Sequence, residues 1–201
     1  MLEAFVIGVF AGYAIAIPVG PIAVLILRTG LRDGLRAAMA AGAGTATADL
    51  IYATLAMTAG PALVALIAPV LLPARLTAAA LLLVLAARQS RGVDFSDAAG
   101  APVATGRTYA TVLALTLLNP ATVIYFASLT VGLPTISSDL AARALFVIGA
   151  ALASLSWQWL LAGAGSALQG RVPPRLAPVT GLVSSAIIAV LALKIAVDAL
   201  S

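Results

Sequence analysis

An apolar run near the N-terminus reads AIAIPVGPIAVLIL and holds Pro18 and Pro21 near its middle. Proline removes one backbone donor and clashes with the carbonyl four residues before it. In the hydrocarbon of a bilayer, each backbone group freed in this way costs several kcal/mol unless protein, water or a ligand satisfies it. The break therefore predicts either that the chain lines a cavity at this depth or that a kink only shapes the helix bundle.

The composition is typical of a polytopic membrane protein. Of the 201 residues, 63% are hydrophobic and 9% are charged, and the mean hydropathy is +1.15. A soluble protein of this size is about half apolar and about a quarter charged. The length allows about six spans of roughly 20 residues, so we expect residues 1–201 to form a single membrane domain without a separate soluble part.

The residue types exclude several classes of function. The chain has no Cys and no His, which removes thiolate and imidazole metal ligands and nucleophiles. The spans hold no carboxylate pair with hydrolytic spacing, and the stretch around Gly42 and Gly44 lacks the Gly-Lys-Ser/Thr ending of a phosphate loop. We therefore expect no enzyme and no cofactor. The net charge of +4 comes from Arg residues between apolar runs, which indicates membrane topology and no nucleic-acid partner.

Hydropathy predicts six spans, near residues 4–27, 37–67, 70–87, 109–131, 140–168 and 176–200. The polar stretch 88–107 joins two halves, 1–90 and 105–201. Because each half has three spans, the second half must insert upside down relative to the first. The predicted fold class is an all-α membrane protein of six transmembrane helices, arranged as two inverted three-helix repeats.

Basic residues predict the orientation. The loops after the first, third and fifth predicted spans hold Arg28, Arg32, Arg36, Arg88, Arg91, Arg107, Arg171 and Arg175. The positive-inside rule places these loops in the cytoplasm. The polar loop 88–107 is then cytoplasmic, and both termini lie outside.

A second helix break is predicted at Asn119-Pro120 in the fourth span, at a depth similar to that of Pro18–Pro21 in the first. Gly20 permits close backbone approach to a ligand, and the Asn119 amide can both donate and accept. Broken helices at matching places in two halves point to the central site of a secondary transporter. Ordinary kinks are the alternative, since proline is frequent in membrane helices.

Asp49 is the only carboxylate well inside a predicted span. A central carboxylate costs at least ~2.5 kcal/mol on insertion scales and usually marks an ion or proton path. Its helical neighbours Thr45 and Tyr52 lie on the same face and are predicted to hydrogen-bond it. Asp49 then either carries a proton by cycling between charged and neutral forms, or pairs with an ammonium group on a substrate. A purely structural hydrogen bond to another helix is the alternative.

The other candidates in the spans are small or aromatic residues. Gly42 and Gly44 indicate close helix packing, which is compatible with a homodimer and equally with packing inside one chain. Trp157 lies too deep for the interfacial belt by the predicted boundaries, so it either lines a pocket or packs in the bundle. Ser156 and Gln158 are polar partners beside it.

The chain resembles the LysE-type exporter family, whose members include lysine/arginine and homoserine/threonine exporters. The resemblance rests on Pro18-Val-Gly-Pro21, on Gly42-x-Gly44 followed by Asp49, and on Asn119-Pro120, in this order and spacing. It implies a six-span protein of the plasma (inner) membrane that exports amino acids, basic or small neutral, or similar solutes. It also implies coupling to a proton or ion gradient.

The predicted substrate and ion site comprises Pro18, Gly20, Pro21, Thr45, Asp49, Tyr52, Asn119, Pro120 and Trp157. The favoured function is a proton-coupled exporter with alternating access around the broken first and fourth spans. An exporter of divalent or heavy-metal cations is the alternative, although it needs more oxygen ligands than these spans offer. A membrane-embedded enzyme or assembly subunit is the third hypothesis.

Overall fold

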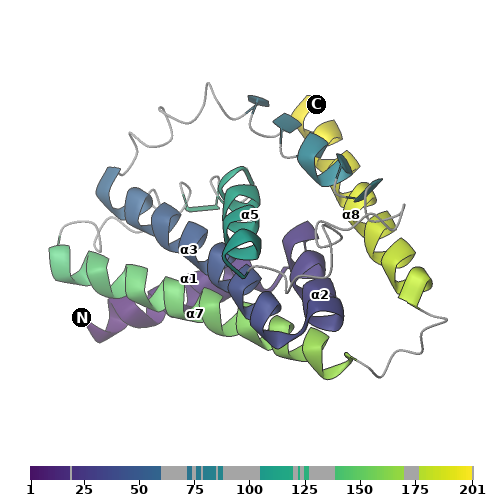
Figure 1. Cartoon of the computed structure of the whole chain (residues 1–201). Helices are drawn as coiled ribbons and strands as arrows, with labels where there is room; N and C mark the ends of the chain where they lie inside the picture. Colours follow the sequence, from purple (N-terminus) through teal and green to yellow (C-terminus); the bar gives the residue numbers. More distant parts are fainter. Residues whose placement is uncertain are drawn as a thin grey trace.

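The computed structural model describes residues 1–18, 20–59, 105–119, 139–169 and 177–200, together with 122, 125, 126 and a number of residues between 72 and 87. These residues contain helices and no strand, which confirms the predicted all-α class. The helices are α1 (Leu2–Ala16), α2 (Pro21–Asp33), α3 (Leu35–Ala59), α5 (Thr105–Leu117), α7 (Leu140–Ala167) and α8 (Ala177–Leu200) (Figure 1). The six-span inverted repeat remains a prediction.

The first predicted span is broken where the prolines fall. Helix α1 ends at Ala16, and α2 begins at Pro21 with its axis inclined by 79° to that of α1. Pro21 occupies the first turn of α2, where its missing donor costs nothing because those N–H groups have no partner inside the helix. The predicted break is confirmed.

The predicted basic loop after the first span is wrong. Helix α2 continues to Asp33, so Arg28 and Arg32 lie on a helix. The connection to α3 is only Gly34, whose φ of +84° suits a residue without a side chain. The side-chain Nε2 of Gln169 donates to the carbonyl of Arg32 at 3.1 Å and so satisfies one of the last carbonyls of α2.

The remaining predicted spans agree with the described helices in part. The second span begins two residues early, at Leu35, and its described helix ends at Ala59, before the predicted limit of 67. Helix α5 ends at Leu117, and its last turn is tightened because the Asn119 N–H donates to the Thr116 carbonyl at 3.0 Å. Helices α7 and α8 lie within one residue of the predicted ranges 140–168 and 176–200. Of the third predicted span, 70–87, the structure describes 72–73, 76–77, 79–84 and 86–87, and all of these residues are helical.

Helix α7 packs against α1, α2 and α3 (Figure 1). Glycines allow this close approach. A Cβ on Gly12 of α1 would lie 2.9 Å from the backbone Cα of Ala150, and one on Gly30 of α2 would lie 2.8 Å from the Ser166 nitrogen. Helix α8 packs against α2 on the other side. The small residues therefore allow α1, α2 and α3 to pack closely against α7, so that the four helices share one interior.

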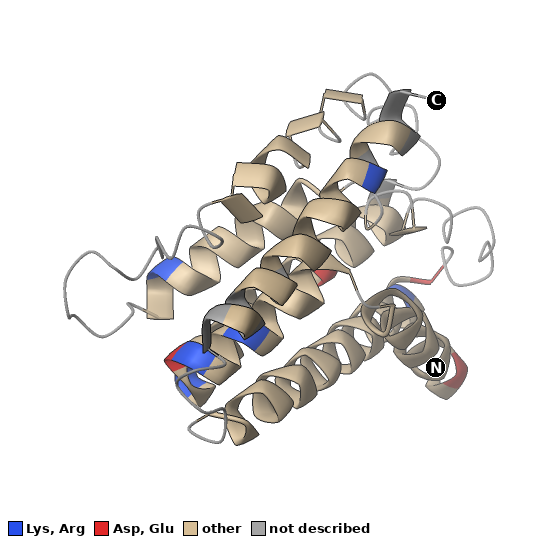
Figure 2. Ribbon diagram, turned by 90° about the vertical axis from the view of Figure 1, so that its right-hand side faces the viewer, with Lys and Arg blue, Asp and Glu red and all other residues tan. Residues whose placement is uncertain are grey.

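The surface of the bundle suits a bilayer. Large apolar side chains face outward from α1, α3, α7 and α8, and charged residues lie mainly near helix ends (Figure 2). Among the described residues, α7 alone is long and apolar enough to span a membrane by itself. Helices α1 and α2 pass the same test as one bent pair.

The α1–α7 contact gives a first prediction. Gly12→Ala places a methyl group against the Ala150 backbone, so we expect it to lower the free energy of unfolding by about 1–3 kcal/mol. Gly163→Ala on α7 is the matched control, because nothing lies within 4 Å of its added Cβ. The control is expected to be neutral or to stabilise by up to ~1 kcal/mol through helix propensity. Thermal unfolding of the two purified variants measures this, and equal stability would contradict the close contact.

Candidate functional site

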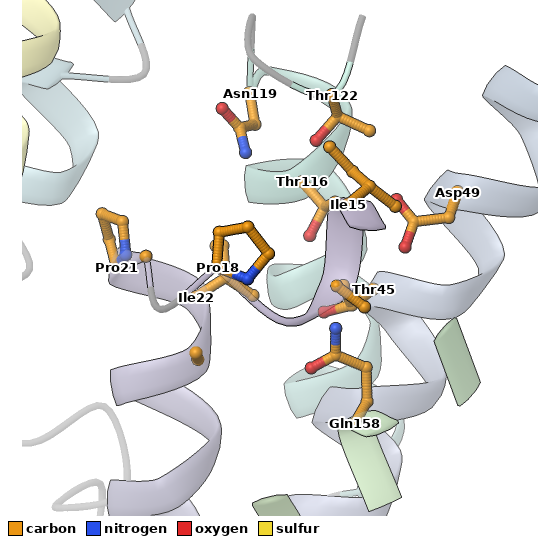
Figure 3. Close-up of a pocket in the computed structure, with 13 residues that line it drawn as sticks. Ile15, Pro18, Pro21, Ile22, Thr45, Asp49, Thr116, Asn119, Thr122 and Gln158 are labelled. Atoms are coloured by element: carbon orange, nitrogen blue, oxygen red, sulfur yellow. The ribbon is translucent and has the colours of Figure 1, made fainter. Parts of the chain in front are cut away.

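A partly open cavity of about 70 Å³ lies where the α1–α2 break meets α3, α5 and α7 (Figure 3). This volume holds several water molecules or a small polar solute. The described residues that line it are Ile15, Ala16, Pro18, Gly20, Pro21, Ile22, Ala23, Thr45, Asp49, Thr116, Asn119, Thr122 and Gln158. Segments from both halves of the sequence therefore contribute to one polar space.

The cavity brings together most of the residues that the sequence singled out. Pro18, Gly20, Pro21, Thr45, Asp49 and Asn119 all line it. Tyr52 and Trp157 do not, and Pro120 lies outside the described residues. The indole Nε1 of Trp157 is buried without a hydrogen-bond partner, while its neighbour Ser156 turns to α1 and shares a 2.9 Å hydrogen bond with the Tyr13 hydroxyl.

Asp49 is the charged centre of the cavity. It is only 3% exposed, and its Oδ2 accepts a hydrogen bond of 2.6 Å from Oγ of the fully buried Ser154 on α7. This bond crosses between α3 and α7, so it fixes the carboxylate in relation to α7. The sequence did not identify Ser154, because a lone serine in an apolar helix carries no signal of its partner.

The predicted hydrogen bonds from Thr45 and Tyr52 to Asp49 are wrong. Each hydroxyl has one proton to donate, and both donate it to a backbone carbonyl. Thr45 donates to Ala41 one turn back at 3.5 Å. Tyr52 donates to the carbonyl of Leu117, the last residue of α5, and the last four carbonyls of a helix have no N–H donor within that helix. Tyr52 therefore satisfies a carbonyl at the C-terminal end of α5.

Helix ends give the cavity two electrostatic poles. The first turn of α2 lines it through Gly20, Pro21, Ile22 and Ala23, and no side chain caps this end. A helix N-terminus carries roughly half a positive charge and attracts anions. The last residues of α1 and α5 also line the cavity, and their C-terminal ends carry the opposite partial charge. Together with Asp49, they form a negative pole opposite the positive end of α2.

Gln158 reaches the cavity from α7. It is 4% exposed, and its Oε1 atom is buried without a hydrogen-bond partner. Figure 3 shows its amide nitrogen directed toward Thr45 and its amide oxygen turned to the side, and the residue lines the cavity. Gln158 was noted in the sequence only as a polar neighbour of Trp157, and Thr116 and Thr122 were missed. Polar residues inside predicted spans were the available signal for all three.

The lining restricts the chemistry of a ligand. Among the described lining residues, Asp49 is the one ionisable group, and the other polar side chains are hydroxyls and amides. No group of three or more carboxylates, His or Cys suited to hold a metal ion occurs in the described part of the chain. The cavity therefore offers one carboxylate, three hydroxyl groups and two amide groups for hydrogen bonding to a small polar solute.

A bundle of apolar helices around a polar cavity, with a helix broken beside a buried carboxylate, defines a membrane transport protein. The family model for the LysE type translocator matches residues 13–199, and the chain belongs to this family. The protein is thus an integral membrane protein of a transporter family that exports small solutes. No curated protein and no solved structure matches the chain.

The Asp49–Ser154 bond gives a second prediction. Ser154→Ala leaves a buried carboxylate without its donor, so we expect the free energy of unfolding to fall by about 1.5–3 kcal/mol. Ser166→Ala is the matched control on α7, because this hydroxyl donates only to the Gly163 carbonyl of its own helix. Unfolding in mixed micelles measures both, and a double-mutant cycle with Asp49→Ala, which removes the acceptor, isolates the pair. Additive effects of the two substitutions would contradict a direct bond.

Proposed function

We propose that the protein exports amino acids across the plasma membrane in exchange for protons, with alternating access around the broken helices. The observation that carries this proposal is the single buried carboxylate, Asp49, in a cavity bordered by helix ends of opposite polarity. Membership of the LysE type translocator family supports a small-solute exporter. The cavity chemistry supports a zwitterion as the solute.

Asp49 couples export of the amino acid to movement of the proton, because the two compete for this one carboxylate. One buried carboxylate is neutralised either by a proton or by the ammonium group of the substrate, and not by both at once. Substrate binding from the cytoplasm therefore requires the deprotonated form, and proton binding from outside displaces the substrate. A buried carboxylate that must stay neutralised while the protein changes conformation makes this exchange obligatory, because an uncompensated charge in the bilayer is costly.

The carboxylate of the substrate binds at the positive pole. The N–H groups of Ile22 and Ala23 in the first turn of α2 are the available donors there, since Pro21 has none. The ammonium group lies toward Asp49 and the C-terminal ends of α1 and α5, near Asn119. This arrangement places the two charges of a zwitterion on the two poles of the cavity.

We propose the overall architecture that hydropathy and the basic residues predict. Residues 1–201 form one transporter domain of six spans in two inverted repeats, joined by a cytoplasmic loop at 88–107, with both termini outside. The two breaks then belong to equivalent helices of the repeats, and rocking of the halves exposes the cavity to each side in turn.

A transport assay tests the exporter function. Proteoliposomes are loaded with the full set of protein amino acids together with Cd²⁺ and Mn²⁺, and a pH gradient is imposed. Mass spectrometry then follows which solutes leave faster than from empty liposomes. We expect selective, gradient-dependent loss of amino acids. Loss of metal ions alone would favour a cation exporter, and no loss of any solute would contradict the proposal.

Asp49→Asn gives a third prediction. The amide cannot exchange a proton, so we expect gradient-driven efflux to fall by roughly 5- to 150-fold, the range of a typical coupling between bound species. Asp139→Asn is the matched control: Asp139 caps α7 through the Ala141 N–H at 3.1 Å and lies outside the cavity, and asparagine caps equally well. Equal pH-gradient dependence in Asp49→Asn and the wild type would remove Asp49 from the coupling.

A further inference from the structure

Gln158 lines the cavity, and its amide oxygen is buried without a hydrogen-bond partner. The residue is 4% exposed. Buried acceptors in folded proteins are almost always satisfied, because an unpaired one retains the full cost of its desolvation. We propose that Gln158 is the specificity-determining residue of the exporter, and that its Oε1 accepts a hydrogen bond from the side chain of the exported amino acid.

The backbone around Gln158 holds this amide in place. A Cβ added to Gly42 of α3 would lie 2.9 Å from the Cβ of Gln158, so the two helices touch at this point. Four residues before Gln158 on the same helix, Ser154 is bonded to Asp49. The stem of Gln158 therefore lies between two contacts of α3 with α7, and the residue lines the cavity.

The group that Gln158 binds is the substrate side chain, and this step depends on the proposed function. The zwitterion uses the first turn of α2 for its carboxylate and Asp49 for its ammonium group. Gln158 enters from α7 in the lower part of Figure 3, apart from the first turn of α2 and from Asp49 on α3. Gln158 on α7 is therefore the contact that remains for the substrate side chain, the group that distinguishes one amino acid from another.

The chemistry of the cavity selects the class of side chain. A hydrogen-bond donor is needed, which favours hydroxyl and amide side chains over aliphatic ones. Among the described lining residues, no second carboxylate is present to pair with a second positive charge. The preferred substrate is therefore a small neutral amino acid with a hydroxyl or amide group, and a basic one is disfavoured.

Threonine and valine test this inference because they have the same shape and differ in the hydroxyl group. Efflux of each is measured from proteoliposomes carrying the wild type, Gln158→Met and Gln169→Met. Methionine preserves the length of the side chain without the amide. Gln169 is the matched control on the turn that follows α7, outside the cavity, where it bonds the Arg32 carbonyl.

We expect the wild type and Gln169→Met to export threonine faster than valine by about tenfold or more, because a site that hydrogen-bonds a hydroxyl rejects the analogue without it. Gln158→Met is expected to lose this preference while retaining export of valine. A preference that persists in Gln158→Met, or an equal loss of both substrates, would overturn the role of Gln158.

Two further results keep the inference separate from the proposed function. Should Gln158→Met fail to fold by size-exclusion chromatography, Gln158→Asn retracts the amide by one methylene and is expected to reduce the threonine preference severalfold; an unchanged preference overturns the inference. A wild type that exports amino acids without preferring threonine to valine also overturns it. A wild type that exports no amino acid overturns the proposed function itself.

Discussion

The need to satisfy backbone groups inside a bilayer is the constraint on which the structure depends. Pro18 and Pro21 end one helix and start the next, so carbonyls at the end of α1 and N–H groups at the start of α2 face the same interior space. The end of α5 adds further carbonyls, one of which accepts a hydrogen bond from the Tyr52 hydroxyl. A polar cavity is the consequence, since such groups persist in a membrane protein only where they meet protein, water or a ligand.

Close packing around α7 turns this space into a defined site. Glycines on α1, α2 and α3 bring the backbones against α7, and the contacts of α3 at Gly42 and Asp49 fall at Gln158 and Ser154. The order of these contacts shows that α3 and α7 cross antiparallel. Asp49 is thereby anchored at one end of the contact, while Gln158 lines the cavity at the other. The same small residues that allow packing thus determine which polar atoms are left for a ligand.

Local chemistry made part of the site predictable. The Pro-x-Gly-Pro break, the buried Asp49 and the position of Asn119 follow from rules that act within one helix, and the structure places these residues on one cavity. Contacts between distant segments were beyond the sequence. Ser154 bonds Asp49 across 105 positions of the chain, and Tyr52 donates to Leu117, so helical neighbourhood gave the wrong partners for Asp49. The extension of α2 to Asp33 was also missed, because hydropathy falls at Arg28 although the helix continues.

The central claim is that one carboxylate holds either a proton or the substrate. The most direct measurement is proton release on binding, made with a pH indicator in weakly buffered detergent solution as an exported amino acid is added to the purified protein. We expect the wild type to release protons in proportion to the substrate bound, and Asp49→Asn to release none. Substrate binding by the wild type without any proton release, at a pH where Asp49 carries its proton, would contradict competition at this residue.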